Sequence, residues 1–129
     1  MLEQDDASVS LVLVVDDEAA IREAVCDVLE LAGIAAVVAT NGHEAIDAYR
    51  RYGERVRLVL LDLRMPGMGG VETYHNLRNL GAVMPIVLSS GYDEKIAGLD
   101  LDSDPQVSML RKPYALEELL AIIYDTFRA

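Results

Sequence analysis

The stretch Leu11-Val-Leu-Val-Val-Asp16-Asp17 decides the fold class of this chain. Five consecutive apolar residues, three of them valine, are typical of a strand buried on both faces, because a half-exposed strand would alternate apolar and polar side chains. The run stops abruptly at two aspartates. Strands of this kind belong to parallel sheets that are covered by helices on both sides, so the chain is predicted to be an α/β protein.

Four further apolar runs extend this pattern along the chain. They predict strands over residues 35–39, 58–61, 86–88 and 107–110. Helical periodicity between and after the strands predicts helices over residues 21–32, 41–52, 71–80 and 115–127, with a weaker one over 93–99. The side chains expected to face inward on three of these helices are Ile21, Val25, Val28 and Ala32, then Val71, Tyr74, Leu77 and Leu80, then Leu116, Leu119, Leu120, Ile123 and Phe127. This alternation calls for parallel strands joined by right-handed crossovers.

Composition narrows the class of protein. A chain of 129 residues is long enough for one domain with one substantial core. The formal net charge of -11 disfavours direct binding to nucleic acid or to an anionic membrane, and it leaves two interpretations open: solubility, or acids gathered to hold a cation. A single cysteine, Cys26, excludes an internal disulfide and fits a reducing cytoplasm. We expect Cys26 to be a small near-core residue rather than a reactive thiol. The sequence shows neither an apolar run long enough to span a membrane nor a secretory signal.

Polar residues with potential chemistry follow several of the predicted strands. Asp16 and Asp17 follow the first, Asp62 ends the third, Ser90 ends the fourth, and Lys112 follows the fifth. In an open parallel sheet, ligands bind at the carboxyl ends of the strands where the strand order reverses. With the order 2-1-3-4-5, that reversal falls between strands one and three, which are the strands that carry the aspartates.

Three carboxylates in one pocket repel one another unless they take up protons or share a cation. A hard divalent cation such as Mg²⁺ suits oxygen ligands and leaves room for a phosphoryl oxygen. A carboxylate can act as a nucleophile toward phosphorus and form an aspartyl phosphate. Lys112 would then pair with a phosphoryl oxygen, and Ser90 would donate a hydrogen bond to another.

Each of these residues also has a purely structural interpretation. Asp16-Asp17 could cap the first helix, and Asp62 could be a turn residue before Pro66. Ser90 beside a glycine is common in loops, and Lys112 alone could be a solvated charge. However, only two of the eleven basic residues are lysine, and one of them stands at this strand end.

In this order and spacing, four segments make the chain similar to the receiver domains of bacterial two-component response regulators. The segments are Val-Val-Asp16-Asp17-Glu18, Leu-Leu-Asp62-Leu-Arg-Met-Pro66-Gly-Met-Gly-Gly70, Pro85-Ile-Val-Leu-Ser-Ser90-Gly and Arg-Lys112-Pro113-Tyr114. The resemblance runs from Leu11 to about Phe127. It implies a flavodoxin-like three-layer α/β/α sandwich with five parallel strands, formed by residues 10–129 after an acidic tail over residues 1–9.

The resemblance also implies residue roles. Asp62 is the expected phosphoacceptor, and Lys112 and Ser90 are expected to act with it. Mg²⁺ is expected to be held by Asp62, by Asp17 together with Asp16 through a water, and by the backbone carbonyl of Arg64. Ser89 competes with Ser90, but counting from Pro85 selects Ser90. A cis peptide bond is expected at Lys112-Pro113.

One position departs from the family pattern, because Met109 stands where the family usually has Tyr or Phe. This substitution puts in doubt the family's switch, in which a ring turns inward as the hydroxyl residue moves. The short helix over residues 93–99, with Asp100, Asp102 and Asp104 after it, is either a solvated loop or a mobile output surface. A further hypothesis is that Arg64 and Tyr92 shield the aspartyl phosphate, so that replacing both with small residues would speed dephosphorylation.

The expected function is that of a cytoplasmic phosphoacceptor signalling domain, which is not an enzyme with an external substrate but which catalyses its own phosphorylation and dephosphorylation. Its expected partner is a sensor histidine kinase or a phosphotransfer domain, without nucleic acid or membrane. The chain could be a free-standing regulator or part of a hybrid kinase.

Three other functions are less consistent with the sequence. A phosphorylation-independent interaction module would usually have lost an acid or the lysine, and both are present here. A flavodoxin is disfavoured because Asp16-Asp17 would repel the flavin phosphate. A haloacid-dehalogenase-like phosphatase is disfavoured because Arg64 stands where its second acid is needed.

Overall fold

The computed structural model describes residues 9–91 and 103–128 of the 129-residue chain. The predicted acidic tail, except for Val9, and the predicted helix over residues 93–99 lie outside the described residues. The strands are β1 (Leu11–Val15), β2 (Ala35–Ala39), β3 (Val56–Asp62), β4 (Ile86–Ser90) and β5 (Val107–Arg111). The helices are α1 (Ala19–Leu31), α2 (Gly42–Tyr52), the 3₁₀ turn η2 (Gly53–Arg55), α3 (Gly70–Asn79) and α4 (Leu116–Arg128).

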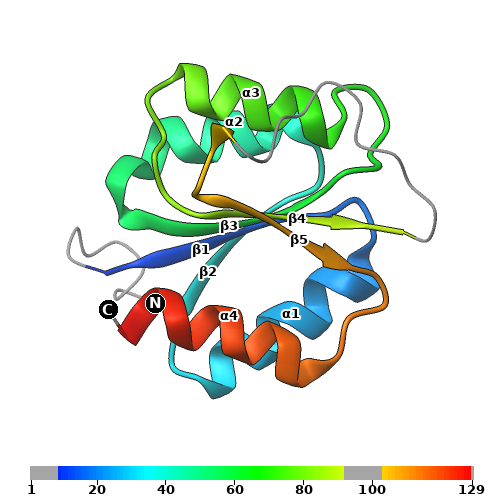
Figure 1. The fold of residues 1–129 in the computed structure, drawn as a ribbon, viewed down its shortest axis with the longest axis vertical. Coiled ribbons are helices and arrows are strands. Elements are labelled where there is room, and N and C mark those ends of the chain that lie inside the picture. The colour runs from blue at the N-terminus through cyan, green and yellow to red at the C-terminus, as the bar shows by residue number, and fades with distance from the viewer. Residues whose placement is uncertain (1–8, 92–102, 129) are drawn as a thin grey trace.

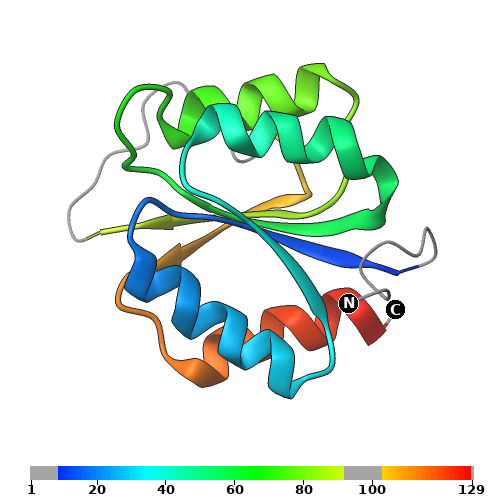
Figure 2. The same cartoon turned by 180° about the vertical axis from the view of Figure 1, so that it is seen from behind.

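The five strands form one parallel sheet in the order β2-β1-β3-β4-β5, as predicted from the sequence. Helices α2 and α3 cover one face of the sheet, and α1 and α4 cover the other (Figures 1 and 2). The strand order reverses at β1 and β3, so the loops after these two strands diverge to opposite faces and leave a crevice at their carboxyl ends.

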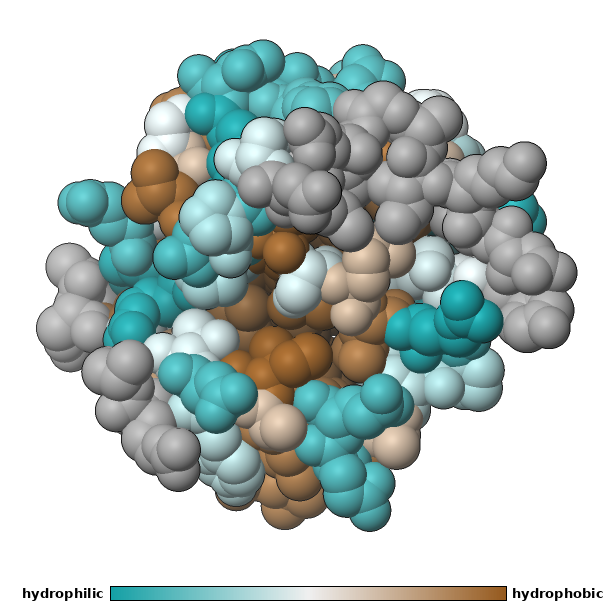
Figure 3. Space-filling model, in the orientation of Figure 1, coloured by the Kyte–Doolittle hydropathy of each residue, from teal (hydrophilic) through white to brown (hydrophobic). Residues whose placement is uncertain are grey.

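Strand β1 alternates between two separate apolar layers, which explains why every one of its residues is buried. Leu13 and Val15 pack toward α2 and α3, whereas Val12 and Val14 pack toward α1 and α4. Figure 3 shows apolar side chains gathered between the two helical layers, with polar side chains on the outer surfaces. Burying each large aliphatic side chain in these layers contributes roughly 1.5–3 kcal/mol to folding. The two layers therefore hold each strand in its register, and with it the polar residues at the strand ends.

Local signals in the sequence define both ends of α2. Asn41 caps α2 by accepting a hydrogen bond from the backbone N–H of Glu44 at 2.9 Å. The Glu44 carboxylate in turn accepts a hydrogen bond from the backbone N–H of Thr40 at 2.7 Å. Helix α2 ends at Gly53, whose φ of 54° is a conformation that favours glycine.

Two predicted inward-facing side chains are exposed in the structure. Leu116 is the first residue of α4, and 53 % of its surface is exposed, because helical side chains lean toward the N-terminus and so point past the end of the helix. Leu80 follows the last residue of α3 and is 41 % exposed. Conversely, Leu29 is fully buried under α1 although it was left out of the predicted inward face.

Candidate functional site

The strand ends bring three of the predicted site residues into direct contact. Asp16 directly follows β1, Asp62 is the last residue of β3, and Lys112 directly follows β5. The Lys112 ammonium lies 2.8 Å from Asp16 Oδ2 and 3.4 Å from Asp62 Oδ2. Lys112 is therefore paired with two carboxylates in this structure, and the interpretation of it as a solvated surface charge is wrong.

Asp16, Asp17 and Asp62 form one acidic cluster. Their carboxylate oxygens lie within 4.8 Å of one another, with Asp16 and Asp62 buried and Asp17 exposed. The cluster borders a cavity of about 560 Å³ lined by Asp17, Glu18, Asp62, Arg64, Met65, Pro66, Gly91 and Lys112. The site is thus a buried pair of acids with one open side, through which a small anion or a side chain of a partner protein could reach Asp62.

Burial and like charge destabilise the ionised form of Asp62. Desolvation, followed by repulsion from Asp16, raises the pKa of Asp62 from 3.8 to about 6, although Lys112 and the backbone N–H of Arg64 oppose this rise. Burial alone would lower the pKa of Lys112, but the contacts with Asp16 and Asp62 outweigh it and raise that pKa. One ammonium therefore only partly compensates two buried carboxylates, which leaves the site suited to a further cation.

The donor set fits a hard divalent cation. Three carboxylates supply oxygen atoms, and Arg64 lines the same cavity with its backbone N–H donating to Asp62 Oδ1 at 3.2 Å. Mg²⁺ is usually held by one or two carboxylates plus waters, so a cluster with an open side meets its requirements. Asp16 also accepts a hydrogen bond from the backbone N–H of Glu18 at 2.9 Å, which fixes the orientation of its carboxylate.

The structural interpretation of Asp16-Asp17 as a helix cap is wrong. Helix α1 begins at Ala19 with Glu18 as its N-cap residue, and no side chain makes a capping hydrogen bond there. Instead, the turn after β1 is held by Arg22, which donates to the backbone carbonyl of Asp16 at 2.7 Å. Neither aspartate is therefore the N-cap residue of α1, although the Asp16 carboxylate binds the backbone N–H of Glu18 just before the helix.

Both serines at the end of β4 lie beside the cluster, and both are buried. Ser89 is paired with Asp62 in the sheet register, and its carbonyl accepts a hydrogen bond from Leu63 N at 2.9 Å. The Ser90 carbonyl accepts a hydrogen bond from Lys112 N at 2.7 Å. The backbone thus links Ser90 to the lysine and Ser89 to the strand of the acceptor, and the choice of Ser90 as the hydroxyl residue stays a prediction.

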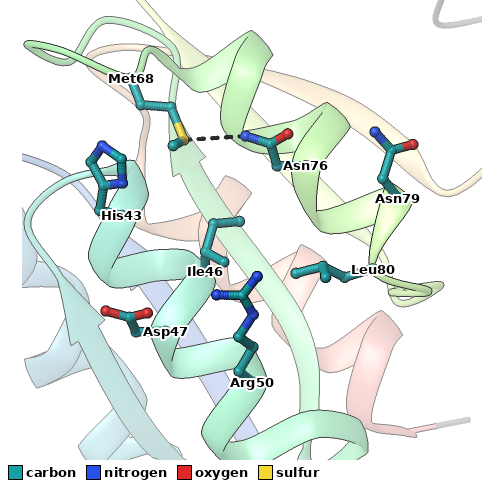
Figure 4. A pocket seen from close by; sticks show the side chains of 8 residues that line it. All are labelled: His43, Ile46, Asp47, Arg50, Met68, Asn76, Asn79 and Leu80. Carbon is teal, nitrogen blue, oxygen red and sulfur yellow. Dashed lines mark hydrogen bonds between the residues drawn. The ribbon is translucent and has the colours of Figure 1, made fainter.

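The loop after Asp62 is packed tightly where it enters α3. A Cβ placed on Gly70 would lie only 2.4 Å from the backbone oxygen of Asp62. Within the loop, the sulfur of Met68 accepts a hydrogen bond from the side-chain amide of Asn76 in α3 at 3.5 Å (Figure 4). Met68 closes one end of a cavity of about 420 Å³ between α2 and α3. These contacts hold the loop that positions Arg64 next to the acceptor.

Sequence reasoning overlooked two neighbours of the cluster. Glu18 lies 3.7 Å from the Lys112 ammonium, and its position directly after Asp16-Asp17 was the available signal. Tyr114 packs near the cluster, where burial and the Asp16 charge raise its pKa, and it comes two residues after Lys112. The peptide bond between Lys112 and Pro113 is cis, as the resemblance implied. Tyr92 lies outside the described residues.

A doubly wound parallel sheet with an acidic cluster and a lysine at its switch point defines a class of α/β domains that bind anions and cations there. The sequence matches the response regulator receiver domain over residues 12–124. The chain therefore belongs to the response regulator receiver domain family, and it shares the family's phosphoacceptor role in two-component signalling.

Individual relatives agree with this assignment. Response regulator MprA of Mycolicibacterium vanbaalenii is 40 % identical over 113 residues, which cover 85 % of this chain and 47 % of that protein. MprA of Mycobacterium leprae is 38 % identical over 120 residues, which cover 91 % of this chain and 50 % of that protein. The chain thus spans about half the length of the curated relatives that it matches.

Solved structures show the same fold. A response regulator receiver protein from Pseudomonas putida superimposes with a TM-score of 0.79 at 35 % identity, covering 93 % of this chain and 99 % of that chain. Chemotaxis protein CheY4 of Vibrio cholerae superimposes with a TM-score of 0.78 at 25 % identity, covering 93 % of this chain and 100 % of that chain. In the described part of the chain, no helix combines the length and the apolar character needed to cross a bilayer.

Proposed function

We propose that Asp62 is the phosphoacceptor of this receiver domain. The observation that supports this role is the combination at one carboxylate of burial, a lysine at 3.4 Å, two neighbouring acids and an open cavity. Asp16 lies closer to Lys112 and does not line the cavity, and Asp17 is exposed, with no lysine contact among the described residues. Asp62 is the acid of the cluster that combines access with a cationic partner.

Asp16, Asp17, Asp62 and the backbone carbonyl of Arg64 would hold Mg²⁺. When bound, this ion would neutralise the charge that develops on the transferred phosphoryl group. The chain's own contribution is positional. Sheet pairing fixes Asp62, the contact between Gly70 and the acceptor backbone fixes the loop, and Arg22 fixes the turn after β1.

The proposed reaction transfers a phosphoryl group from a phosphohistidine of a sensor histidine kinase or a phosphotransfer domain. A carboxylate oxygen of Asp62 attacks phosphorus, so an O–P bond forms while the N–P bond breaks, and the leaving imidazole keeps the electron pair and takes a proton from solvent. Lys112 pairs with a phosphoryl oxygen as a point charge, and Ser90 donates a hydrogen bond to another. These groups lie within the receiver, so the domain would catalyse its own phosphorylation and dephosphorylation.

The aspartyl phosphate would shift an existing equilibrium between two packings of the β4 and β5 region in a cytoplasmic regulator. The direct partner of this domain would be the phosphodonor. We expect the acidic surface of the domain to disfavour nucleic acid, whatever an attached effector binds.

A second candidate function is a phosphorylation-independent interaction module, and Met109 is the observation in its favour. Met109 is half-buried and packs against the apolar cluster beneath α2 and α3, at the position where relatives usually carry the aromatic residue. The flexible thioether of Met109 can fill a gap in the core, but it has no ring that could turn inward when the domain is phosphorylated. A chain that binds neither Mg²⁺ nor a phosphoryl analogue would support this module.

The test is intact mass after incubation with acetyl phosphate and Mg²⁺. One added phosphoryl group is expected for the unaltered chain, and none for Asp62→Asn or in the presence of EDTA. Asp17→Asn is the matched comparison, because it removes an acid of the same cluster without removing the acceptor, so slower addition is expected. Addition to Asp62→Asn would place the acceptor elsewhere.

A further inference from the structure

A second cluster of polar side chains joins α3 to the turn before β5, at the opposite end of β5 from Lys112. Arg78 Nε donates to Asp104 Oδ2 at 2.9 Å, and the Tyr74 hydroxyl donates to the same oxygen. The Arg78 guanidinium lies 5.4 Å from the centre of the Tyr74 ring. We call Tyr74, Arg78 and Asp104 the α3–β5 clamp.

Arg78 ties three segments of the chain together. Besides Asp104, its guanidinium donates to the carbonyls of Ala82 at 3.1 Å and Met84 at 2.8 Å, in the connection from α3 to β4. It also donates to the carbonyl of Gln106 at 3.2 Å, just before β5. The Arg78 and Asp104 side chains are only 17 % and 18 % exposed, so water screens this ion pair less than a surface pair, and removing one partner would leave the other charge partly buried without it.

The clamp acts on a strand that has few other attachments. Among residues 9–91 and 103–128, strand β5 is at the edge of the sheet and has β4 as its only pairing partner. At its amino end, the backbone N–H of Gln106 donates to Asp104 Oδ1 at 2.9 Å, and the Gln106 carbonyl accepts from Ile86 N at 2.8 Å. At its carboxyl end, Lys112 N donates to the Ser90 carbonyl. The clamp and the acidic cluster therefore hold the two ends of one short strand.

Lys112, which directly follows β5, lies closer to one of its two buried carboxylates than to the other. The ammonium lies 2.8 Å from Asp16 but 3.4 Å from Asp62, so in the clamped structure it is placed mainly for Asp16. A phosphoryl group on Asp62 would attract the ammonium away from Asp16. If β5 moves together with Lys112, the displacement reaches the clamp at the other end of this five-residue strand.

We propose that the α3–β5 clamp is coupled to the phosphorylation site, and that it stabilises the unphosphorylated arrangement of β5. This inference rests on the proposed function, because it assumes that Asp62 accepts the phosphoryl group and that Lys112 follows. Tyr74, Arg78 and Asp104 are positioning residues, since they act on the site only through β5 and Lys112. By linkage, loosening the clamp tightens binding of a phosphoryl analogue, and binding of the analogue loosens the clamp.

The test measures the affinity of the whole chain for beryllofluoride, an analogue of the phosphoryl group, in the presence of Mg²⁺. Asp104→Asn removes the charge that Arg78 binds but keeps the size of the side chain. Arg78→Lys keeps the positive charge but loses the guanidinium fork that reaches four acceptors at once. Affinity is expected to rise about five-fold in each. Tyr74→Phe removes a single donor, so it is expected to cause a smaller rise and covers the case in which the stronger variants do not fold.

Arg57→Lys is the matched control for Arg78→Lys. Arg57 also donates to a backbone carbonyl, that of Thr126 at 3.3 Å, and also lies over an aromatic ring, that of Phe127 at 5.1 Å. However, Arg57 joins β3 to α4, and neither of these two contacts involves β5. Arg57→Lys should lower the thermal midpoint without changing the affinity for beryllofluoride. This control distinguishes an effect on the position of β5 from a general loss of stability.

The outcomes distinguish the clamp from the proposed function. Unchanged or weaker beryllofluoride affinity in the folded clamp variants would overturn the proposed coupling between the clamp and the phosphorylation site. It would not affect the assignment of Asp62 as the phosphoacceptor. An equal rise in Arg57→Lys would also overturn the coupling, because any destabilisation would then produce the effect. Failure of the unaltered chain to bind beryllofluoride would overturn the proposed function and the clamp together.

Discussion

At the scale of single residues, ionised Asp62 lowers the stability of the folded state. Its charged form is disfavoured by burial and then by Asp16, which raise its pKa from 3.8 to about 6. An acid whose pKa is higher in the folded state than in the unfolded state binds its proton more tightly when folded. Protonation of Asp62 therefore stabilises the fold, and this stabilisation is lost as the pH rises from about 4 through about 6.

Asp62→Asn is expected to increase the free energy of unfolding by about 1–3 kcal/mol at pH 7.5 in EDTA, because the amide removes a buried charge that desolvation and the Asp16 carboxylate disfavour. Urea unfolding between pH 4 and 8 would measure it. The unaltered chain should lose stability relative to the variant across pH 4 to 6 and run parallel above pH 7. Parallel curves over the whole range would show that Asp62 titrates normally.

The two serines after β4 can be separated by the same kind of substitution. Ser90→Ala is expected to slow phosphorylation of Asp62 by acetyl phosphate about ten-fold or more, since a hydrogen bond to a charged transition state is worth roughly 1.5–3 kcal/mol. Ser89→Ala is the matched control, because Ser89 is equally buried one residue earlier. A larger effect of Ser89→Ala on the rate would exchange the roles of the two residues.

At the scale of elements, the start of α3 sets the position of the acceptor. A Cβ on Gly70 would lie 2.4 Å from the backbone oxygen of Asp62 and 2.5 Å from Leu63 Cα. Neither is the mobile end of a side chain, so the loop or the strand would have to move. By contrast, a Cβ on Gly69 would meet only the Leu63 carbonyl at 3.7 Å, which is an ordinary contact.

Gly70→Ala is therefore expected to destabilise the fold by about 1–3 kcal/mol, the usual cost of overpacking, and to slow phosphorylation of Asp62. Gly69→Ala should change the free energy of unfolding by less than about 0.5 kcal/mol. Denaturant unfolding and the acetyl phosphate reaction rate measure both. Equal effects of the two substitutions would show that close backbone contact at Gly70 does not position the acceptor.

The elements also show what the sequence could predict. Continuous apolar runs such as Leu11–Val15 have one stable solution, a strand between two helical layers, so the sheet and the aspartates at its edge could be predicted. The exposure of Leu116 depended on where α4 begins rather than on periodicity. The clamp joins Arg78 to a residue 26 positions away through side-chain geometry, and no local pattern indicates such a contact.

At the scale of the whole molecule, a net charge of -11 makes the domain responsive to cations. Screening by salt should stabilise it modestly, whereas Mg²⁺ should stabilise it specifically by binding the acidic cluster. At 100 times its dissociation constant, Mg²⁺ is expected to add about 2.7 kcal/mol to the free energy of unfolding.

Thermal unfolding with Mg²⁺, and with NaCl at matched ionic strength, would measure the specific part. Asp17→Asn should lose most of it, because that variant lacks one carboxylate of the cluster. Glu117→Asn is the control, since it removes an exposed acid at the start of α4, outside the cluster. If Mg²⁺ and NaCl raised the midpoint equally, the cluster would not be a metal site.

Two arginines, Arg55 just before β3 and Arg57 within it, bear on how the domain can be joined to other polypeptides. Arg55 binds the carbonyl of Val9 at 3.1 Å, and Arg57, two residues later, binds that of Thr126 at 3.3 Å. The path into the fold and the path out of it are thus fastened side by side at one end of β3, and Asp62 ends the same strand roughly 20 Å away. The domain can therefore be inserted between two segments of a longer polypeptide without separating the ends of those segments. The flanking segments would also lie away from the cavity through which the phosphodonor reaches Asp62.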